Sequence, residues 1–157
     1  MKTKNFVFGV LALGMLFFIP LVGNGQNCEP LNTAQLKKML TELGYTTKDL
    51  ETKPGKEKYE VKHTLRAFDV PVGYEISPST NFIWLTVMLG KHKTDTSYSF
   101  ALLKHNAKIQ PCFFYITASG NLMMGLAVEN RGVTNAILRK HTDKILNDVI
   151  DNAAVWK

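Results

Sequence analysis

Histidine is the side chain best suited to acid–base or metal chemistry near neutral pH, and this chain has His63, His92, His105 and His141. None of them stands in an H-E-x-x-H motif or another close pair that would hold a metal ion. His63 alternates into the apolar side of a predicted strand, and His141 lies on the apolar stripe of the last predicted helix. His105 lies near a helix end, where a cation is mildly favoured. We therefore predict structural roles for these side chains, no metal site and no cofactor.

Nucleophiles and paired carboxylates are equally hard to find. The chain has no G-x-S-x-G elbow, and Ser119 falls in a predicted hairpin turn. Its glycines form neither G-x-G-x-x-G nor a P-loop. Asn106 closes a helix, where its amide can satisfy loose main-chain groups. The strand region holds few carboxylates and no paired set: Glu60, Asp69, Glu75, Asp95 and Glu129. We predict no catalytic residue and a protein that is not an enzyme.

The two cysteines, Cys28 and Cys112, permit one disulfide in an oxidising compartment. Such a bridge would tie the N-terminal segment to a strand and stabilise the fold by a few kcal/mol. Cys112 also sits in an apolar run, where a free cysteine behaves as a small core residue. Both interpretations stay open, and the absence of a C-x-x-C motif excludes a thioredoxin-like role.

The first 25 residues are typical of a secretory signal peptide. Lys2 and Lys4 are followed by an apolar run over 6–22 and then by small residues that allow cleavage before Gln26. A retained membrane anchor would want about 20 apolar residues, and a lipoprotein signal would place a small residue directly before Cys28. We predict export to the periplasm or the exterior of a bacterial cell, one domain over 26–157, and no stable membrane span after cleavage.

Charge gives little information about partners. Without Lys2 and Lys4, the 19 basic residues become 17 against 13 acidic ones, a net charge of +4. The lysines are scattered along the chain, and a mildly basic balance favours anionic partners only weakly. We predict no nucleic-acid binding.

Hydrophobic periodicity predicts the elements. Apolar residues at helical spacing predict a first helix that starts at Asn32 or Thr33 and stops at Gly44. The polar stretch 45–58 is predicted as a solvated loop. Alternation predicts strands over 59–66 and 70–76, and an apolar run predicts a third strand over 82–89.

A second helix with Phe100, Leu103 and Ala107 on its apolar face follows, and then a hairpin of strands 112–117 and 122–128 turning at Ser119-Gly120. A long helix from Val133 to Trp156 closes the chain. Strands joined by short turns pair antiparallel. The sequence therefore predicts an α+β fold with helices packed on a five-stranded antiparallel sheet, in the order α-β-β-β-α-β-β-α.

The strand over 82–89 has more apolar side chains than one sheet face needs. Phe82, Trp84 and Met88 point to one side, and a second set points to the other: Ile83, Leu85, Val87 and Leu89. One set belongs to the core. The other is covered by a helix or a second subunit, or forms an exposed patch that marks an interface. Phe82, Trp84 and Met88 are thus the candidate interface residues.

This order of elements resembles the type III secretion chaperone-like fold, and more closely its YbjN-type domains, described as bacterial sensory transduction regulators. The resemblance spans about residues 31–155 and is carried by L-L-K-H-N at 102–106, F-F-Y-I-T-A-S-G-N-L-M-M-G-L-A-V at 113–128 and the long helix from Val133. It implies binding and no catalysis: such chaperones are usually dimers that hold extended client segments.

The hypothesis is an exported, non-enzymatic, chaperone-like domain that binds a protein partner or a second copy through an apolar sheet surface. The alternative is a small-molecule binding module with a pocket between the last helix and the sheet, which would need an enclosed apolar cavity with convergent polar groups.

Overall fold

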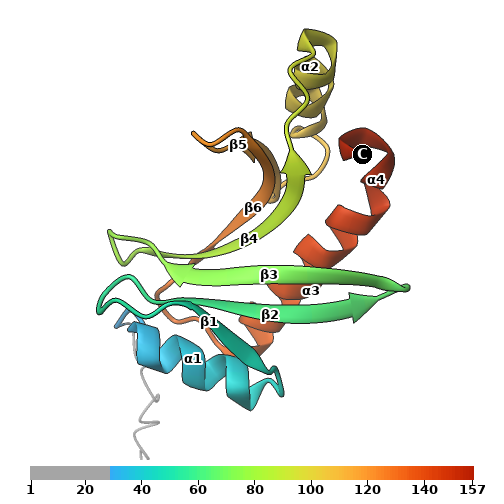
Figure 1. Ribbon diagram of the computed structural model, residues 1–157. Helices are drawn as coiled ribbons and strands as arrows, with labels where there is room; N and C mark the ends of the chain where they lie inside the picture. Colours follow the sequence, from blue (N-terminus) through green and yellow to red (C-terminus); the bar gives the residue numbers. More distant parts are fainter. Residues whose placement is uncertain (1–28) are drawn as a thin grey trace, which may run out of the picture.

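A computed structural model of the chain describes residues 29–157. Six antiparallel strands form one sheet in the order β1-β2-β3-β4-β6-β5 (Figure 1). The strands are β1 (Thr47–Glu51), β2 (Lys58–Leu65), β3 (Phe68–Ile76), β4 (Phe82–Lys91), β5 (Phe113–Ile116) and β6 (Asn121–Glu129). The helices are α1 (Thr33–Glu42), α2 (Thr96–His105), α3 (Asn135–Asp151) and α4 (Ala153–Trp156).

The predicted α+β class and antiparallel pairing agree with this architecture, but the prediction of five strands is wrong. The order is α-β-β-β-β-α-β-β-α-α, and the missed strand is β1, in the stretch predicted as a loop. Leu50 is the only apolar residue of β1, which pairs with β2 at the sheet edge and is exposed along most of its length. An edge strand that buries almost nothing carries no hydrophobic periodicity, so its pairing with β2 is its only signature.

Side-chain caps start the three long helices. Asn32 Oδ1 accepts from the Gln35 main-chain N–H at 2.9 Å, and Gln35 Oε1 accepts from the Asn32 main-chain N–H. These two bonds form a capping box at the start of α1. Asp95 caps α2 by accepting from the Tyr98 main-chain N–H, and Thr134 caps α3 by accepting from the Ile137 main-chain N–H. Gly44 ends α1 with φ +81°, as the sequence predicted.

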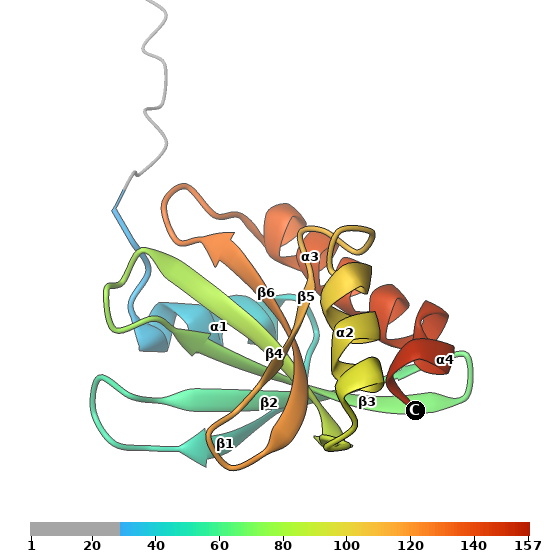
Figure 2. The same cartoon turned by 90° about the horizontal axis from the view of Figure 1, so that it is seen from above.

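The closing helix is shorter than predicted. It ends at Asp151, and Asn152 separates it from the single turn of α4. The Asn152 amide donates to the Asp148 carbonyl at 2.7 Å, and its Oδ1 lies 2.5 Å from His105 Nε2. These side-chain bonds compete with helix continuation. Figures 1 and 2 both place α4 beside α2, where the Tyr98 hydroxyl donates to the Trp156 carbonyl at 2.6 Å.

The core lies between one face of the sheet, here called the inner face, and the helices α1 and α3. From α1, Leu36 and Leu40 are completely buried, and from α3 Leu138 and Ile145 are as well. Alternate residues of the central strands face them: Tyr59, Val61, Val70, Val72, Tyr74, Ile83, Leu85, Val87, Leu122, Met124, Leu126 and Val128. The period-2 patterning of the sequence thus grouped the residues of these strands by face correctly, although for the strand over 82–89 it left open which set belongs to the core.

The predicted apolar face of the second helix does not point to the core. Leu102 is the buried residue of α2, whereas Phe100 is 56% exposed and Leu103 is 65% exposed. Ala107 lies beyond the helix end. Three neighbouring apolar residues, Ala101, Leu102 and Leu103, leave the helical phase ambiguous, and tertiary packing selects Leu102.

Candidate binding surface on the outer face of the sheet

The three candidate interface residues lie together on the outer face of β4, away from α1 and α3. Phe82 is 42% exposed, Met88 is 55% exposed, and Trp84 is half-buried. Ile83, Leu85 and Val87, with the opposite orientation, are buried in the core. The structure therefore decides between the two sets: the inner one is core, and the outer one remains accessible in the described part of the chain.

Neighbouring strands extend this surface. The β4–β6 register places Met123 beside Met88, and the β5–β6 register places Tyr115 beside Met123. We call the combined set the outer platform: Phe82, Trp84, Met88, Phe113, Tyr115 and Met123. It draws side chains from three strands, β4, β6 and β5.

Aromatic contacts fix the centre of the outer platform. The rings of Trp84 and Phe113 meet edge to face, with centroids 6.0 Å apart and planes at 80°. The centroids of the Phe113 and Tyr115 rings lie 5.8 Å apart, with the ring planes at 42°. Such geometries stabilise aromatic pairs by about 0.5–1.5 kcal/mol beyond their buried area. The cluster is therefore an ordered surface.

Gly125 makes room for these rings. A Cβ built at Gly125 would lie 3.0 Å from Tyr115 Cε1 and 3.1 Å from Phe113 Cζ. Beside the rings opens a shallow hollow of about 330 Å³, lined by Glu75, Trp84, Thr86, Phe113 and Tyr115. Burial, with the Glu75 carboxylate nearby, raises the pKa of the Tyr115 phenol, so this hydroxyl stays neutral and can donate a hydrogen bond.

The other half of the outer face is charged. Lys58 pairs with Glu75 at 3.3 Å, while Lys62 pairs with Asp69 at 2.6 Å. Lys48 lies 3.7 Å from Glu60 on the β1–β2 pair. In cross-strand pairs of this kind, each charged side chain is neutralised by its partner on the neighbouring strand. The outer face thus divides into an apolar half on β4, β6 and β5 and a neutralised half on β1, β2 and β3.

The histidines occupy structural positions. His63 Nε2 lies 3.1 Å from the Tyr74 hydroxyl, which in turn lies 3.0 Å from Thr142 Oγ1 in the core. Burial lowers the pKa of His63 and raises that of Tyr74, so both are neutral at pH 7. His92 Nε2 lies 3.0 Å from Ser99 Oγ, and burial lowers the pKa of His141.

Among residues 29–157, no group of three or more histidine, cysteine or carboxylate side chains could hold a metal ion.

Asn106 closes α2, as predicted, and it also binds the sheet edge. Its Nδ2 donates to the Phe114 carbonyl at 3.2 Å, and its Oδ1 accepts from the Phe114 N–H at 2.7 Å. The side-chain amide thus pairs with Phe114 as a neighbouring strand would. Ser119 turns the β5–β6 hairpin, where its Oγ lies 3.0 Å from Thr117 Oγ1.

Cys112 is 1% exposed, and burial holds the pKa of its thiol above the ordinary value. Its predicted partner, Cys28, lies outside the described residues, as does the predicted signal peptide over 1–25, so both stay predictions. None of the helices described between residues 29 and 157 is long and apolar enough to cross a membrane.

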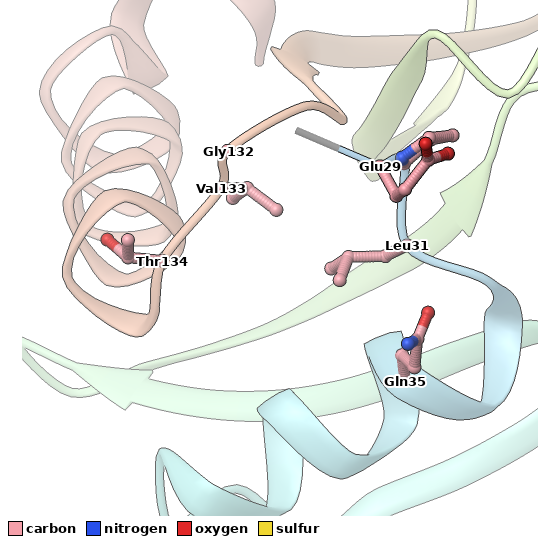
Figure 3. A pocket seen from close by; sticks show the side chains of 7 residues that line it. Glu29, Leu31, Gln35, Gly132, Val133 and Thr134 are labelled. Carbon is pink, nitrogen blue, oxygen red and sulfur yellow. The ribbon is translucent and has the colours of Figure 1, made fainter. Parts of the chain in front are cut away.

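A second hollow lies at the N-terminal segment. It measures about 220 Å³ and opens between the start of α1 and the loop before α3 (Figure 3). Its lining comprises Glu29, Pro30, Leu31, Gln35, Gly132, Val133 and Thr134. The completely buried Asn130 holds this region together. Its Nδ2 donates to the Leu31 and Thr80 carbonyls at 3.0 and 2.8 Å, and its Oδ1 accepts from the Leu31 N–H at 3.2 Å.

Sequence reasoning found the β4 part of the outer platform but missed Phe113, Tyr115 and Met123. Alternation over 112–117 put Phe113 and Tyr115 on one side of their strand, which the structure confirms. Their meeting with Trp84 depends on β6 lying between β4 and β5, with Trp84 opposite Ala127 and Phe113 opposite Gly125. That strand order has no local signature in the sequence.

Comparison with known protein families finds no match, and no curated protein matches the chain. Among solved structures, one chain of the heterodimeric ExoU–SpcU complex from the type III secretion system of Pseudomonas aeruginosa is similar. The identity is 13%, the TM-score is 0.47, and the match covers 76% of this chain and 96% of that one. The YbjN-type assignment is not confirmed, because no family model matches the chain.

Proposed function

We propose that this protein is an exported, non-enzymatic protein-binding domain that forms a homodimer through the outer platform. The observation that carries the proposal is an ordered aromatic surface that the described chain leaves uncovered. Phe82 and Met88 are 42% and 55% exposed, beside the packed rings of Trp84, Phe113 and Tyr115. Large exposed apolar patches on soluble proteins mark interaction sites.

The composition of the surface suits an interface. Aromatic and methionine side chains are enriched at the centres of interfaces, and the outer platform consists of nothing else. The charged rows beside it are already paired, by Lys58 with Glu75 and by Lys62 with Asp69. Two copies can therefore approach face to face without bringing together unpaired like charges from these rows.

The alternative of a small-molecule pocket between the last helix and the sheet has less support. The side chains that α3 turns toward the sheet are completely buried at Leu138, Thr142 and Ile145. Thr142 completes its hydrogen bonding within the fold, to the Leu138 carbonyl and the Tyr74 hydroxyl. This contact is packed core, in which a ligand would have to displace side chains.

The test is light scattering coupled to size-exclusion chromatography, with the protein expressed with its own first 25 residues. We expect a chain that starts at Gln26 by intact mass and a particle of twice that mass. Trp84→Ala removes the central ring, so we expect the dimer to weaken by about 2 kcal/mol or more, about 30-fold in Kd. Leu50→Ala is the control, because Leu50 is similarly exposed (45%) but lies on β1, at the far edge of the sheet.

A folded Trp84→Ala protein that dimerises like wild type would refute the role of the outer platform. A wild-type protein that stays monomeric at high concentration would refute the homodimer. Retention of the first 25 residues would refute export by a cleaved signal.

A further inference from the structure

One row of the outer face has almost no side-chain bulk. The strand registers align Gly73 on β3 with Thr86 on β4, and Thr86 with Gly125 on β6. Larger side chains from the neighbouring row and from β5 stand around these small residues, and they border the hollow of about 330 Å³ beside Trp84. We call it the aromatic hollow. Its volume is at the small end of the range for ligand pockets, which is about 300–1,000 Å³.

Three aromatic rings and one carboxylate line the aromatic hollow. The ring planes of Trp84 and Phe113 stand at 80° to each other, and those of Phe113 and Tyr115 at 42°, so the rings border the hollow in different planes. Glu75 lies opposite Trp84 in the β3–β4 register and brings its carboxylate to the same hollow. Aromatic ring faces carry partial negative charge and the carboxylate carries a full one, so this lining favours a cation.

Lys58 approaches Glu75 from the other side. It lies opposite Glu75 on β2, whereas Trp84 lies opposite Glu75 on β4, so Glu75 stands between the lysine and the rings. Lys58 is not part of the hollow lining. The Lys58–Glu75 pair is 3.3 Å long, and its side chains are 30% and 36% exposed. Exposed pairs of this kind are weak, so the Glu75 carboxylate can also attract a cation that enters the hollow.

We propose that the aromatic hollow binds a quaternary ammonium group, with its methyl groups against the three rings and its charge beside the Glu75 carboxylate. A primary ammonium fits less well, because each of its three N–H donors needs an acceptor and Glu75 already pairs with Lys58. A quaternary ammonium has no N–H to satisfy, and aromatic cages are a general means of recognising it. The site is complete in one copy of the chain, so the inference goes beyond the proposed homodimer.

The test compares choline with two matched compounds. Dimethylbutanol, the tert-butyl analogue of choline, has a carbon in place of the nitrogen and therefore lacks the charge. Ethanolamine keeps the charge but lacks the methyl groups. Each compound is titrated into the isotope-labelled protein, and binding is followed by NMR through the indole N–H signals of its two tryptophans, Trp84 and Trp156. Trp156 is the internal reference, because its Nε1 donates to the Val149 carbonyl at 2.7 Å and lies outside the hollow lining.

We expect choline to shift the Trp84 signal in a saturable way while the Trp156 signal stays in place. The other two compounds should bind at least about tenfold more weakly. Equal binding of choline and dimethylbutanol would mean that the hollow selects only apolar groups and would overturn the proposal. Equal shifts of both tryptophan signals, or no shift of the Trp84 signal, would also overturn it.

Substitutions of opposite sign test the role of the carboxylate. Glu75→Gln should weaken choline binding about tenfold, whereas Lys58→Met removes the competing ammonium and should tighten it about threefold. The matched controls are Glu60→Gln and Lys62→Met, which remove the same charges from other ion pairs of the outer face, outside the hollow lining. Both controls should bind choline like wild type. Choline binding that is unchanged by Glu75→Gln would overturn the role of the carboxylate.

The proposed dimer shares three rings with the hollow, so a variant must separate the two. Phe82→Ser combined with Met88→Ser removes exposed members of the outer platform that do not line the hollow. We expect this variant to be monomeric by light scattering and to bind choline at least as tightly as wild type. A monomeric variant that does not bind choline would refute the ligand site alone. A variant that binds choline and stays dimeric would refute the dimer interface alone.

The ammonium group can belong to a free solute or to the headgroup of a phosphatidylcholine lipid. Sedimentation with vesicles distinguishes these sources. A protein that sediments with phosphatidylcholine vesicles, and not with phosphatidylglycerol vesicles, binds the lipid headgroup. A protein that binds choline and stays in the supernatant takes the free solute.

Discussion

Gly125→Ala tests whether the outer platform depends on the bare backbone beneath its rings. The added Cβ would lie 3.0 Å from Tyr115 Cε1, and 3.1 and 3.3 Å from Phe113 Cζ and Cε2, so both rings must move by a few tenths of an ångström. The φ angle of Gly125 is not in the left-handed region, so alanine brings no backbone strain. The two rings are only half-buried and can tilt outward.

The expected stability change is the difference of two opposing terms. Crowding a packed site costs about 1–3 kcal/mol, with the low end appropriate where neighbours can move. Replacing glycine by alanine at a compatible backbone geometry stabilises the folded state by about 0.4–1 kcal/mol, because the unfolded chain loses conformational freedom. We therefore expect Gly125→Ala to change the free energy of unfolding by less than about 1 kcal/mol, about 4 °C in melting temperature. The displaced rings should nevertheless weaken the dimer about tenfold.

Gly73→Ala is the matched comparison on β3. A Cβ there would lie 2.9 Å from Thr86 Oγ1 and 3.2 Å from Lys58 Cε. Thr86 is 6% exposed and β-branched, so its rotamer cannot yield easily. We expect a cost of about 2 kcal/mol. Chemical denaturation measures both variants. Equal destabilisation by the two substitutions would refute the claim that the aromatic rings can move, and an unchanged dimer in Gly125→Ala would refute the dependence of the interface on their positions.

Two further predictions concern the core and the N-terminal segment. Burial lowers the pKa of His63, so the unfolded state binds its proton more readily, and stability should fall as pH drops below the ordinary histidine value near 6.5. pH-dependent thermal melts should show a shallower fall in His63→Gln than in the wild type. Asn130→Ala leaves the main-chain groups of Leu31 and Thr80 without their hydrogen-bond partner and should lower the free energy of unfolding by about 2–4 kcal/mol. The control is Asn121→Ala, which should lower it by less than about 1 kcal/mol, because Asn121 Oδ1 has no partner. Equal melting temperatures for these two variants would contradict the role of Asn130.

The elements that bury a regular apolar face were predictable. Alternation separated the two faces of β3, β4 and β6, and helical spacing found α1 through Leu36 and Leu40. The failures share a physical cause, which is that tertiary context decided the outcome. Leu50 is the single apolar residue of β1, so main-chain pairing with β2 holds that strand in place. Asn130 resembles an ordinary loop residue in the sequence, and its burial depends on Leu31, 99 positions away.

Only the part of the candidate surface that follows from alternation within one strand was predictable from the sequence. The orientation of Phe82, Trp84 and Met88 follows from alternation, but their accessibility depends on which face α1 and α3 cover. The sequence could not exclude core on both sides. The rest of the outer platform follows from the order β4-β6-β5, which long-range pairing sets.

The stretch from Tyr98 onward supplies three members of the outer platform, Phe113, Tyr115 and Met123. β5 is a four-residue edge strand that is apolar on both sides, with Phe113 and Tyr115 outward and Phe114 and Ile116 inward. An apolar edge of this kind invites uncontrolled pairing, and proteins protect such edges with charges or by covering them. Here the Asn106 side chain covers the edge at Phe114 by bonding both of its main-chain groups. The protection stops at Ile116, whose main-chain N–H and C=O face the same outward side as those of Phe114, so at this residue the β5 edge stays open to strand addition.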